Sequence, residues 1–260
     1  PRFLPSCMIL VFKMLIFSSN TGFLILPKKP ISVTRKKKPS FDYVRITSMT
    51  IPEIVLASNS PRRKEILGWT GLRFSTHAAD IDEKPIPGES PLDHVMRLAE
   101  LKGRACANFA PFNGLVLSAD TSVVDNDEIL GKPKDAEDAR RMLRQLRGRM
   151  HSVHTAIMLM VPSKGIMHTA TCSTPVHMRR YTDEEVDAYI STGDPLDKAG
   201  AYAIQHPQFR PVVKFAGCYA SVMGLPLCHV ERTLRKMGFG DRREIPYQCQ
   251  NALSYACPIY

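Results

Sequence analysis

The sequence predicts an α/β fold with a mixed sheet. Strand-like and helix-like segments mix throughout residues 53–238, instead of separating into one half of strands and one half of helices. The strand-like segments are apolar runs, whereas the helix-like segments repeat their apolar residues at helical spacing. Hydrophobic residues make up 44% of the 260 residues and charged residues 23%, which excludes a wholly disordered chain, a collagen-like repeat and a polytopic membrane protein.

The first strand, turn and helix are predicted from residue 53 onward. Glu53–Ala57 is an apolar run that suits a buried strand, and residues 58–60 form a turn. Pro61–Trp69 is expected to be helical, because Ser60 can cap its N-terminus and proline is favoured at the first helical position. A strand–turn–helix unit therefore opens the regular part of the chain.

The same helix-start signal recurs at Ser90, where a proline again follows. The helix that it begins is expected to extend to about Ala107, with its apolar residues near one face. Leu115–Ala119 is then a short buried strand that ends at Asp120. The polar run at residues 125–127 marks a hairpin turn after it.

Seven further elements complete the predicted fold. Thr182 and Glu185 form a capping box at one helix start, and Gly238 suits the C-cap of the last helix. In chain order the elements are an amphipathic helix at Asp135–Leu146, long strands at His151–Val161 and Thr171–Arg180, a helix from Thr182 to about Ser191, short strands at Val212–Phe215 and Cys218–Val222, and a closing helix at Leu225–Met237.

The predicted domain plan has three parts, of which the first is set apart by its charge. Residues 1–48 hold nine Lys or Arg and one acidic residue, a net charge of +8, whereas residues 49–260 carry only +2. This basic leader is expected to be disordered or absent from the native product; organelle targeting, or contact with a membrane surface or nucleic acid, are the alternatives. Its apolar pieces are shorter than the roughly 20 residues that span a bilayer, so no stable membrane span is predicted. Residues 49–240 form the globular domain, for which no nucleic-acid partner is expected, and residues 241–260 form a loose tail.

The cysteines indicate a compartment for the protein. There are seven of them, an odd number, and no two form a Cys-x-x-Cys pair. This pattern argues against a disulfide framework and against a zinc cage. We therefore expect reduced thiols and a cytoplasmic location.

The strongest local signal for chemistry is the run Ser58-Asn59-Ser60-Pro61-Arg62-Arg63, which lies between the first strand and the first helix. A helix N-terminus presents free N–H groups and a partial positive charge, and arginines add forked donors that suit phosphate. The run therefore indicates a site for a polyanion. A capped helix with solvated arginines explains the same residues.

Two carboxylates are candidates for binding a metal ion or activating water. Asp120 follows an apolar strand, and ligands of open α/β sheets gather beyond the carboxyl ends of strands. The same aspartate could instead cap the next turn. Glu83 lies in a polar loop, where an ordinary surface acid is the alternative.

Several other polar residues have both a functional and an ordinary interpretation. Lys102 on a helix and Lys132 in a turn would each be solvated surface charges if considered alone. Gln205 could read the edge of a base or cap the backbone. His151 and His154 are three residues apart on a predicted strand, so they point to opposite faces and do not suggest a shared metal.

The order of these residues is more specific than any one of them. The series consists of Ser58-Asn59-Ser60-Pro61-Arg62-Arg63, the loop with Glu83, Arg97-Leu98-Ala99 with Lys102, Ala119-Asp120-Thr121, Gly131-Lys132-Pro133, Asp197-Lys198-Ala199-Gly200-Ala201-Tyr202 with Ile204-Gln205, and Gly224-Leu225-Pro226-Leu227. Over roughly residues 53–238, this series resembles the Maf family of nucleoside triphosphate pyrophosphatases.

The resemblance implies a fold, an activity and a cofactor. Maf proteins have an elongated α/β fold with a deep central cleft, similar to that of the inosine triphosphate pyrophosphatases. They hydrolyse nucleoside triphosphates to the monophosphate and pyrophosphate with Mg²⁺ or another divalent cation, and so remove unwanted nucleotides. Many relatives are homodimers, but no interface signature is visible in this sequence.

The resemblance also implies roles for particular residues. Arg63, Lys102 and Lys132 would neutralise the triphosphate, and the N–H groups after Ser58 would cradle one phosphate, with Ser60 beside it. Glu83 and Asp120 would hold the divalent ion. Asp120 is the first choice to activate water for attack on the α-phosphorus, although the two acids could exchange these roles.

A substrate preference follows from the same comparison. Maf enzymes that favour dTTP and UTP resemble this chain in having Arg62, Thr121 and Gln205, which would read the base, since an amide can pair with both a carbonyl and a ring N–H. The family often has glycine after the glutamine, whereas this chain has His206-Pro207, which stiffens the loop and adds a titratable ring. This departure concerns base selectivity more than catalysis.

Three alternatives to a dTTP/UTP pyrophosphatase stay open. A Maf-like enzyme could prefer a modified purine nucleotide such as 7-methyl-GTP. A non-catalytic regulator of cell division could bind nucleotide without hydrolysing it, although such a sensor would not need both Asp120 and Glu83. A nucleic-acid-binding module driven by the basic leader would show steeply salt-dependent binding that is lost on deletion of residues 1–48.

Overall fold

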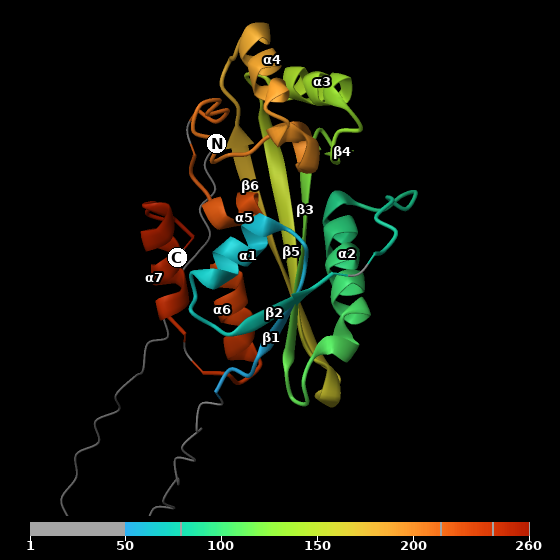
Figure 1. The fold of residues 1–260 in the computed structure, drawn as a ribbon, viewed down its shortest axis with the longest axis vertical. Helices are drawn as coiled ribbons and strands as arrows, with labels where there is room; N and C mark the ends of the chain where they lie inside the picture. Colours follow the sequence, from blue (N-terminus) through green and yellow to red (C-terminus); the bar gives the residue numbers. More distant parts are fainter. Residues whose placement is uncertain (1–49, 79, 214, 241, 260) are drawn as a thin grey trace, which may run out of the picture. The chain divides into compact units, whose positions relative to one another are not determined.

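A computed structural model describes residues 50–78, 80–213, 215–240 and 242–259 (Figure 1). The basic leader predicted for residues 1–48 lies outside the described residues. The strands are β1 (Ile54–Ala57), β2 (Phe74–His77), β3 (Leu115–Asp125), β4 (Glu128–Leu130), β5 (Met150–Val161) and β6 (Ile166–His177). The α-helices are α1 (Pro61–Gly68), α2 (Pro91–Ala105), α3 (Ala136–Leu146), α4 (Asp183–Ser191), α5 (Tyr219–Met223), α6 (Leu227–Lys236) and α7 (Glu244–Leu253). Short 3-10 helices are η1 (Ala107–Phe109), η2 (Pro162–Lys164), η3 (Asp194–Asp197) and η4 (Ala199–Ala201).

The strands form one mixed sheet, as the sequence predicts. Its order is β2-β1-β3-β5-β6, and β4 pairs with β3 outside this path. β1 runs parallel to both of its neighbours, β2 and β3, whereas β3, β4, β5 and β6 pair antiparallel. The fold class is therefore α/β with both kinds of strand pairing.

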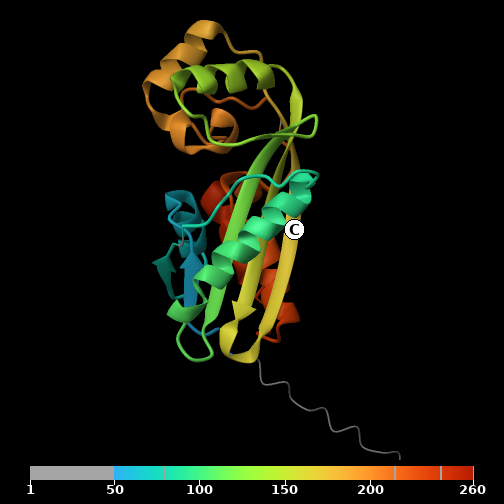
Figure 2. The same cartoon turned by 90° about the vertical axis from the view of Figure 1, so that its right-hand side faces the viewer.

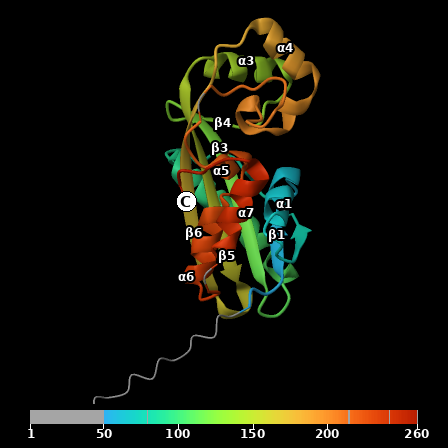
Figure 3. The ribbon, with the colours of Figure 1, turned by 90° about the vertical axis from the view of Figure 1, so that its left-hand side faces the viewer.

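Helices cover both faces of the sheet because successive apolar side chains along a strand point to opposite faces of the sheet. Val55 and Val116 point to one face, where they pack with Val95 and Ala99 of α2, which crosses in front of the strands in Figure 2. The neighbouring leucines of β1 and β3 belong to the opposite core, which α1, α5, α6 and α7 cover (Figure 3). The two cores hold the sheet between two helical layers.

The longest paired strands, β5 and β6, form a hairpin. Their register runs from Met150 opposite His177 to Val161 opposite Ile166. The connection contains η2 and ends at Gly165, whose φ of 62° is in the left-handed region where glycine is favoured. α3 and α4 pack together at the end of this hairpin that lies far from the turn (Figure 1).

β3 is longer than the sequence predicts, and this changes the position of Asp120. The strand continues to Asp125, so Asp120 lies in its middle and not at its carboxyl end. Polar residues at 118 and 120–122 end the apolar run, so hydrophobicity alone does not indicate that the strand continues. β1 ends much earlier, with Leu56 opposite Leu117, so Asp120 lies just beyond the carboxyl end of β1. The strand end at which a ligand site was expected is therefore the carboxyl end of β1 and not that of β3.

The C-terminal part of the chain differs most from the prediction. The segment predicted as a strand at Cys218–Val222 is mostly the one-turn helix α5, and Val212 forms only an isolated bridge with Met178. Residues 241–260 were expected to be a loose tail, but ten of them form α7, whose Ile245 and Cys249 are buried in the core. No side chain caps the N-terminus of α7, so the usual signal of a helix start is absent there.

The helix-start signals are confirmed where the sequence has them. Ser60, Ser90 and Thr182 each accept a hydrogen bond from the backbone N–H three residues later. Thr182 and Glu185 bond reciprocally, as the capping box requires. Among the described residues, no helix combines the length and the apolar character needed to cross a membrane.

Candidate active site

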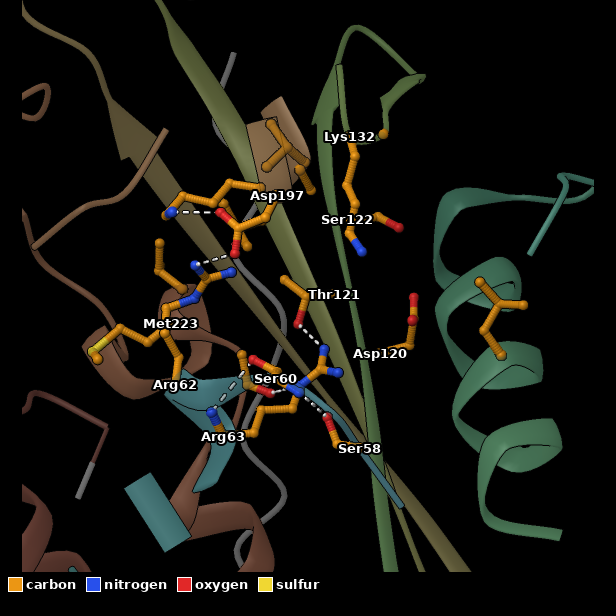
Figure 4. A pocket seen from close by; sticks show the side chains of 18 of the residues that line it. Ser58, Ser60, Arg62, Arg63, Asp120, Thr121, Ser122, Lys132, Asp197 and Met223 are labelled. Carbon is orange, nitrogen blue, oxygen red and sulfur yellow. Dashed lines mark hydrogen bonds and ion pairs between the residues drawn. The ribbon is translucent and has the colours of Figure 1, made fainter. Parts of the chain in front are cut away.

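A cavity of about 640 Å³ opens beside the end of β1 (Figure 4). Its walls come from the turn before α1, the middle of β3, α2, the loop after β4 and the segment around η3 and η4. Every residue that the sequence and the family resemblance nominated for the site lines this cavity. These residues are Ser58, Ser60, Arg62, Arg63, Glu83, Lys102, Asp120, Thr121, Lys132 and Gln205.

The turn between β1 and α1 is held by its own serines. The Oγ of Ser58, a buried residue, accepts a hydrogen bond from the Ser60 N–H at 3.1 Å. The Oγ of Ser60 in turn accepts from the Arg63 N–H at 3.5 Å, which caps the helix. The turn therefore directs the first turn of α1, with its partial positive charge, toward the cavity.

Lys102 joins the two candidate carboxylates. Its Nζ lies 2.7 Å from Glu83 Oε1 and 2.5 Å from Asp120 Oδ1. The lysine comes from α2, the aspartate from the middle of β3 and the glutamate from the loop that precedes α2. The side chains of Lys102 and Asp120 are largely buried, whereas that of Glu83 is half exposed. One ammonium group thus holds two carboxylates from separate elements at the same point.

The positive charges around Glu83 keep it ionised. Partial burial raises its pKa, but the hydrogen bond and charge of Lys102 act against this. The charges of Lys132 and Arg63 add to the effect of Lys102, and the pKa of Glu83 lies below its ordinary value as a result. Glu83 is therefore a carboxylate at neutral pH.

Arg63 is fixed between α5 and β3. Its Nε donates to the carbonyl of Gly224 at 2.9 Å, and its Nη2 donates to Thr121 Oγ1 at 3.1 Å. Desolvation lowers the pKa of Arg63, while the charge of Asp120 acts in the opposite direction. No local sequence pattern indicates the contact between Gly224 and this arginine, because the two residues lie far apart in the chain.

Arg62 takes part in an ion pair that spans the cavity. Its Nη1 lies 3.7 Å from Asp197 Oδ2 in η3, and the other oxygen of Asp197 lies 2.6 Å from the Nζ of Lys198 (Figure 4). Lys198 is buried and also pairs with Asp194 at 2.9 Å. Asp197 therefore links Arg62 to the buried Lys198, a contact that the sequence motif alone does not indicate.

Lys132 and Gln205 reach the cavity from its other wall. Lys132 extends from the loop after β4 into the cavity (Figure 4), and Gln205 follows η4 at an exposed position. Gln205 also lines a second cavity of about 330 Å³, which His206 lines as well. The Nδ1 of His206 accepts from the Phe209 N–H at 2.9 Å, and its ring packs against Tyr189. His206 lines the second cavity and is not among the residues that line the first.

The two histidines on β5 lie apart from this site. His151 is buried, and its Nε2 lies 2.8 Å from the hydroxyl of Tyr202. Burial lowers the pKa of His151 to about 4, so it is neutral at physiological pH. His154 pairs with Ser173 through its Nδ1 at 2.7 Å. The two rings have separate partners, in agreement with the strand geometry.

Carboxylates and cations therefore face one cavity. Arg62, Arg63, Lys102 and Lys132 supply positive charge, which suits a ligand with several negative charges. Glu83 and Asp120 offer oxygen atoms for a hard cation or for a proton. Within the described part of the chain, no three or more His, Cys, Asp or Glu side chains form a group that could hold a metal ion.

Known proteins with similar sequences share most of this chain. The family described as Maf-like protein matches residues 53–237. A dTTP/UTP pyrophosphatase of Anaeromyxobacter dehalogenans is 47% identical over 190 residues, and one of Citrifermentans bemidjiense is 49% identical over 185 residues. These alignments cover 72% and 71% of this chain and 95% of each relative. The solved structure of the Staphylococcus aureus Ham1 protein is 19% identical with a TM-score of 0.36, covering 48% of this chain and 71% of that chain.

Proposed function

The chain belongs to the Maf-like protein family, and from this premise we propose that it hydrolyses dTTP and UTP to the nucleoside monophosphate and pyrophosphate. The observation that carries the proposal is the contact of Lys102 with both Glu83 and Asp120 inside a cavity lined by further cations. Relatives with 47–49% identity over 95% of their length are named dTTP/UTP pyrophosphatases, which supports the choice of substrate.

The cations of the cavity would bind the triphosphate. Arg63, Lys102 and Lys132 come from three different elements, and a triphosphate is long enough to contact several of them. The first turn of α1 would add backbone donors for one phosphate group. Neutralising the phosphate charge and aligning the reacting atoms account for most of the catalysis in phosphoryl transfer.

Asp120 is our choice for the group that activates water. Its Oδ1 is bonded to Lys102, and among the described residues no donor contacts its Oδ2, which leaves this atom for a water molecule. The carboxylate would take a proton from water as the water oxygen attacks the α-phosphorus. The bond from that phosphorus to the bridging oxygen then breaks, and pyrophosphate leaves with this oxygen. Glu83 could exchange roles with Asp120.

The same two carboxylates fit a divalent cation such as Mg²⁺. Mg²⁺ prefers oxygen ligands and is commonly held by one or two carboxylates together with substrate phosphates. Glu83 and Asp120 supply two such groups at one point, which agrees with this pattern and does not require a third protein ligand. When bound, the ion would neutralise charge on the phosphate oxygens.

The thiols agree with the compartment that we propose, the cytoplasm. All six cysteines within the described ranges are free, and five of them are buried. Reduced thiols are usual where glutathione and thioredoxin keep cysteines unpaired. A test is to compare the free-thiol count of the protein purified under native, non-reducing conditions with the cysteine count of the sequence.

A panel of triphosphates tests the proposed function. Purified protein is incubated with Mg²⁺ or Mn²⁺ and each of dTTP, UTP, dCTP, dATP, GTP and 7-methyl-GTP, and both monophosphate and pyrophosphate are measured. We expect dTTP and UTP to be cleaved faster than the purine triphosphates. Equal rates on all of them, or a preference for 7-methyl-GTP, would refute the substrate assignment. Nucleotide binding without release of pyrophosphate would instead favour a regulator.

A further inference from the structure

A chain of hydroxyl groups lies behind the candidate base-reading residue Thr121. Thr121 of β3 stands directly opposite Thr155 of β5 in the sheet register, and their Oγ1 atoms are 3.0 Å apart. Thr155 is completely buried, and its Oγ1 lies 2.8 Å from the carbonyl oxygen of Ser221 in α5. At the other end of this chain of hydroxyl groups, Arg63 donates a hydrogen bond to Thr121.

The chemistry of its two ends fixes the direction of every hydrogen bond in this chain. A backbone carbonyl can only accept, so the hydroxyl hydrogen of Thr155 is directed to Ser221. Thr155 therefore has no hydrogen left for Thr121, and Thr121 must donate to Thr155. A guanidinium can only donate, so Thr121 accepts from Arg63.

This order determines what Thr121 can offer to a ligand. A hydroxyl group has one hydrogen to donate and two lone pairs that accept. The hydrogen of Thr121 is directed to Thr155, and one lone pair is used by Arg63, so the remaining capacity is a single lone pair. Thr121 lines the cavity next to Asp120 (Figure 4). Toward a bound nucleotide it is an acceptor and not a donor.

We propose that Thr155 is a positioning residue that selects the base of the substrate by keeping Thr121 an acceptor. The inference rests on the proposed function, with the base placed against Thr121. Thymine and uracil present an N–H at ring position 3, which an acceptor can bind. Cytosine presents a bare ring nitrogen there, which would face the lone pair of Thr121 without a hydrogen between them. An unpaired buried group of this kind lowers affinity roughly tenfold.

The Thr155→Val variant tests the inference. Valine has nearly the same shape but no hydroxyl, so the hydrogen of Thr121 becomes free to turn toward the base. We expect the ratio of kcat/KM for dTTP to that for dCTP to fall about tenfold, with kcat for dTTP changed less than about threefold. Thr155→Ser retains the hydroxyl and should keep the ratio within about twofold of the wild type.

Two further variants separate this role from a structural one. Thr174→Val removes a buried hydroxyl from β6, at a position that does not line the cavity, and should leave the dTTP/dCTP ratio unchanged. Thr121→Val, at a half-buried position, should lower the ratio by about the same factor as Thr155→Val. The double variant should lower it no further, because both changes remove the same interaction.

The outcomes distinguish this inference from the proposed function. An unchanged ratio in folded Thr155→Val, or an equal loss in Thr155→Ser, would overturn the role of Thr155. If Thr155→Val does not fold, an unchanged ratio in Thr121→Val overturns the inference on its own. A wild-type protein that releases pyrophosphate from no triphosphate refutes the proposed function and the inference together.

Discussion

At the scale of single residues, the environment of Asp120 leads to the first prediction. The side chain is largely buried, and Lys102 holds one of its oxygens. Asp120→Asn keeps the shape but cannot take up a proton, so we expect kcat for dTTP to fall by ~100-fold or more with little change in melting temperature. Asp125→Asn is a matched control, because this buried aspartate is on the same strand but does not line the cavity. Near-normal turnover in Asp120→Asn would exclude it as the base.

The lowered pKa of Glu83 gives a second prediction at this scale. Lys102 is the main cause of the lowering, and Lys132 contributes through its charge alone. In Lys102→Met we expect the pKa of Glu83 to rise above the wild-type value, and in Lys132→Met to rise by less. Carboxyl NMR titration of labelled glutamate measures both shifts, and an equal rise in the two variants would contradict the prediction.

The same shift determines how Glu83 affects folding as the pH changes. Because its pKa is lower in the folded state, Glu83 contributes to stability at pH values above its ordinary pKa. This contribution is lost as the pH falls from the ordinary value through the lowered one. The half-exposed position of Glu83 keeps the contribution small, since solvent screens its charge.

At the scale of elements, the end of α5 supports a third prediction. Gly224 has a φ of 113°, and its carbonyl accepts from Arg63. A Cβ added at Gly224 would lie 3.2 Å from the Nε of Arg63. We expect Gly224→Ala to cost about 1–2 kcal/mol of unfolding free energy and to raise KM for dTTP, because Arg63 must move.

Gly68→Ala is the control for this substitution. Gly68 is the last residue of α1, its φ is not in the positive range, and an added Cβ would meet no atom within 4 Å. We expect this variant to have unchanged KM and equal or slightly higher stability, because alanine favours helix more than glycine does. Urea unfolding and steady-state kinetics measure both effects. An unchanged KM in Gly224→Ala would contradict the prediction that Gly224 keeps Arg63 in position.

The elements that the sequence predicted correctly are those with signals inside the element itself. α1, α2 and α4 each begin with a serine or threonine cap, and these caps require no knowledge of the rest of the fold. β1 has only four residues but was predicted because all four are apolar and buried. β2 is equally short but of mixed polarity, and α5 has only five residues, so neither carries a comparable signal. α7 has no capping side chain, although Ile245, Cys249 and Leu253 are spaced by four and could have indicated a helix.

The candidate site was predicted from the sequence as a set of residues but not as a geometry. The order of the motifs named its members, and all of them line one cavity. That Lys102 lies between Glu83 and Asp120 depends on how α2 packs on β3, which no local pattern specifies. The partners of Arg63 and Thr121 on α5 and β5 lie far away in the chain for the same reason.

At the scale of the whole molecule, α7 is predicted to contribute to the stability of the core. Ile245 is 1% exposed and packs with the core that α6 also joins. Ile245→Ala should lower the free energy of unfolding by about 2–5 kcal/mol, because a cavity replaces the side chain. Tyr247→Ala, on the same helix but 62% exposed, should change it by less than about 0.5 kcal/mol. Chemical denaturation measures both, and equal small effects would mean that the tail is loose after all.

The hairpin of β5 and β6 has a consequence for the time order of folding. Its two strands are joined by a short turn, so they can pair without closing a long loop. The parallel pairing of β1 with β3 has to bring together segments about 60 residues apart. We expect pulsed hydrogen exchange during refolding to protect amides of the hairpin before those of β1. The scaffold would then exist before the candidate catalytic cavity, which needs the end of β1 in place.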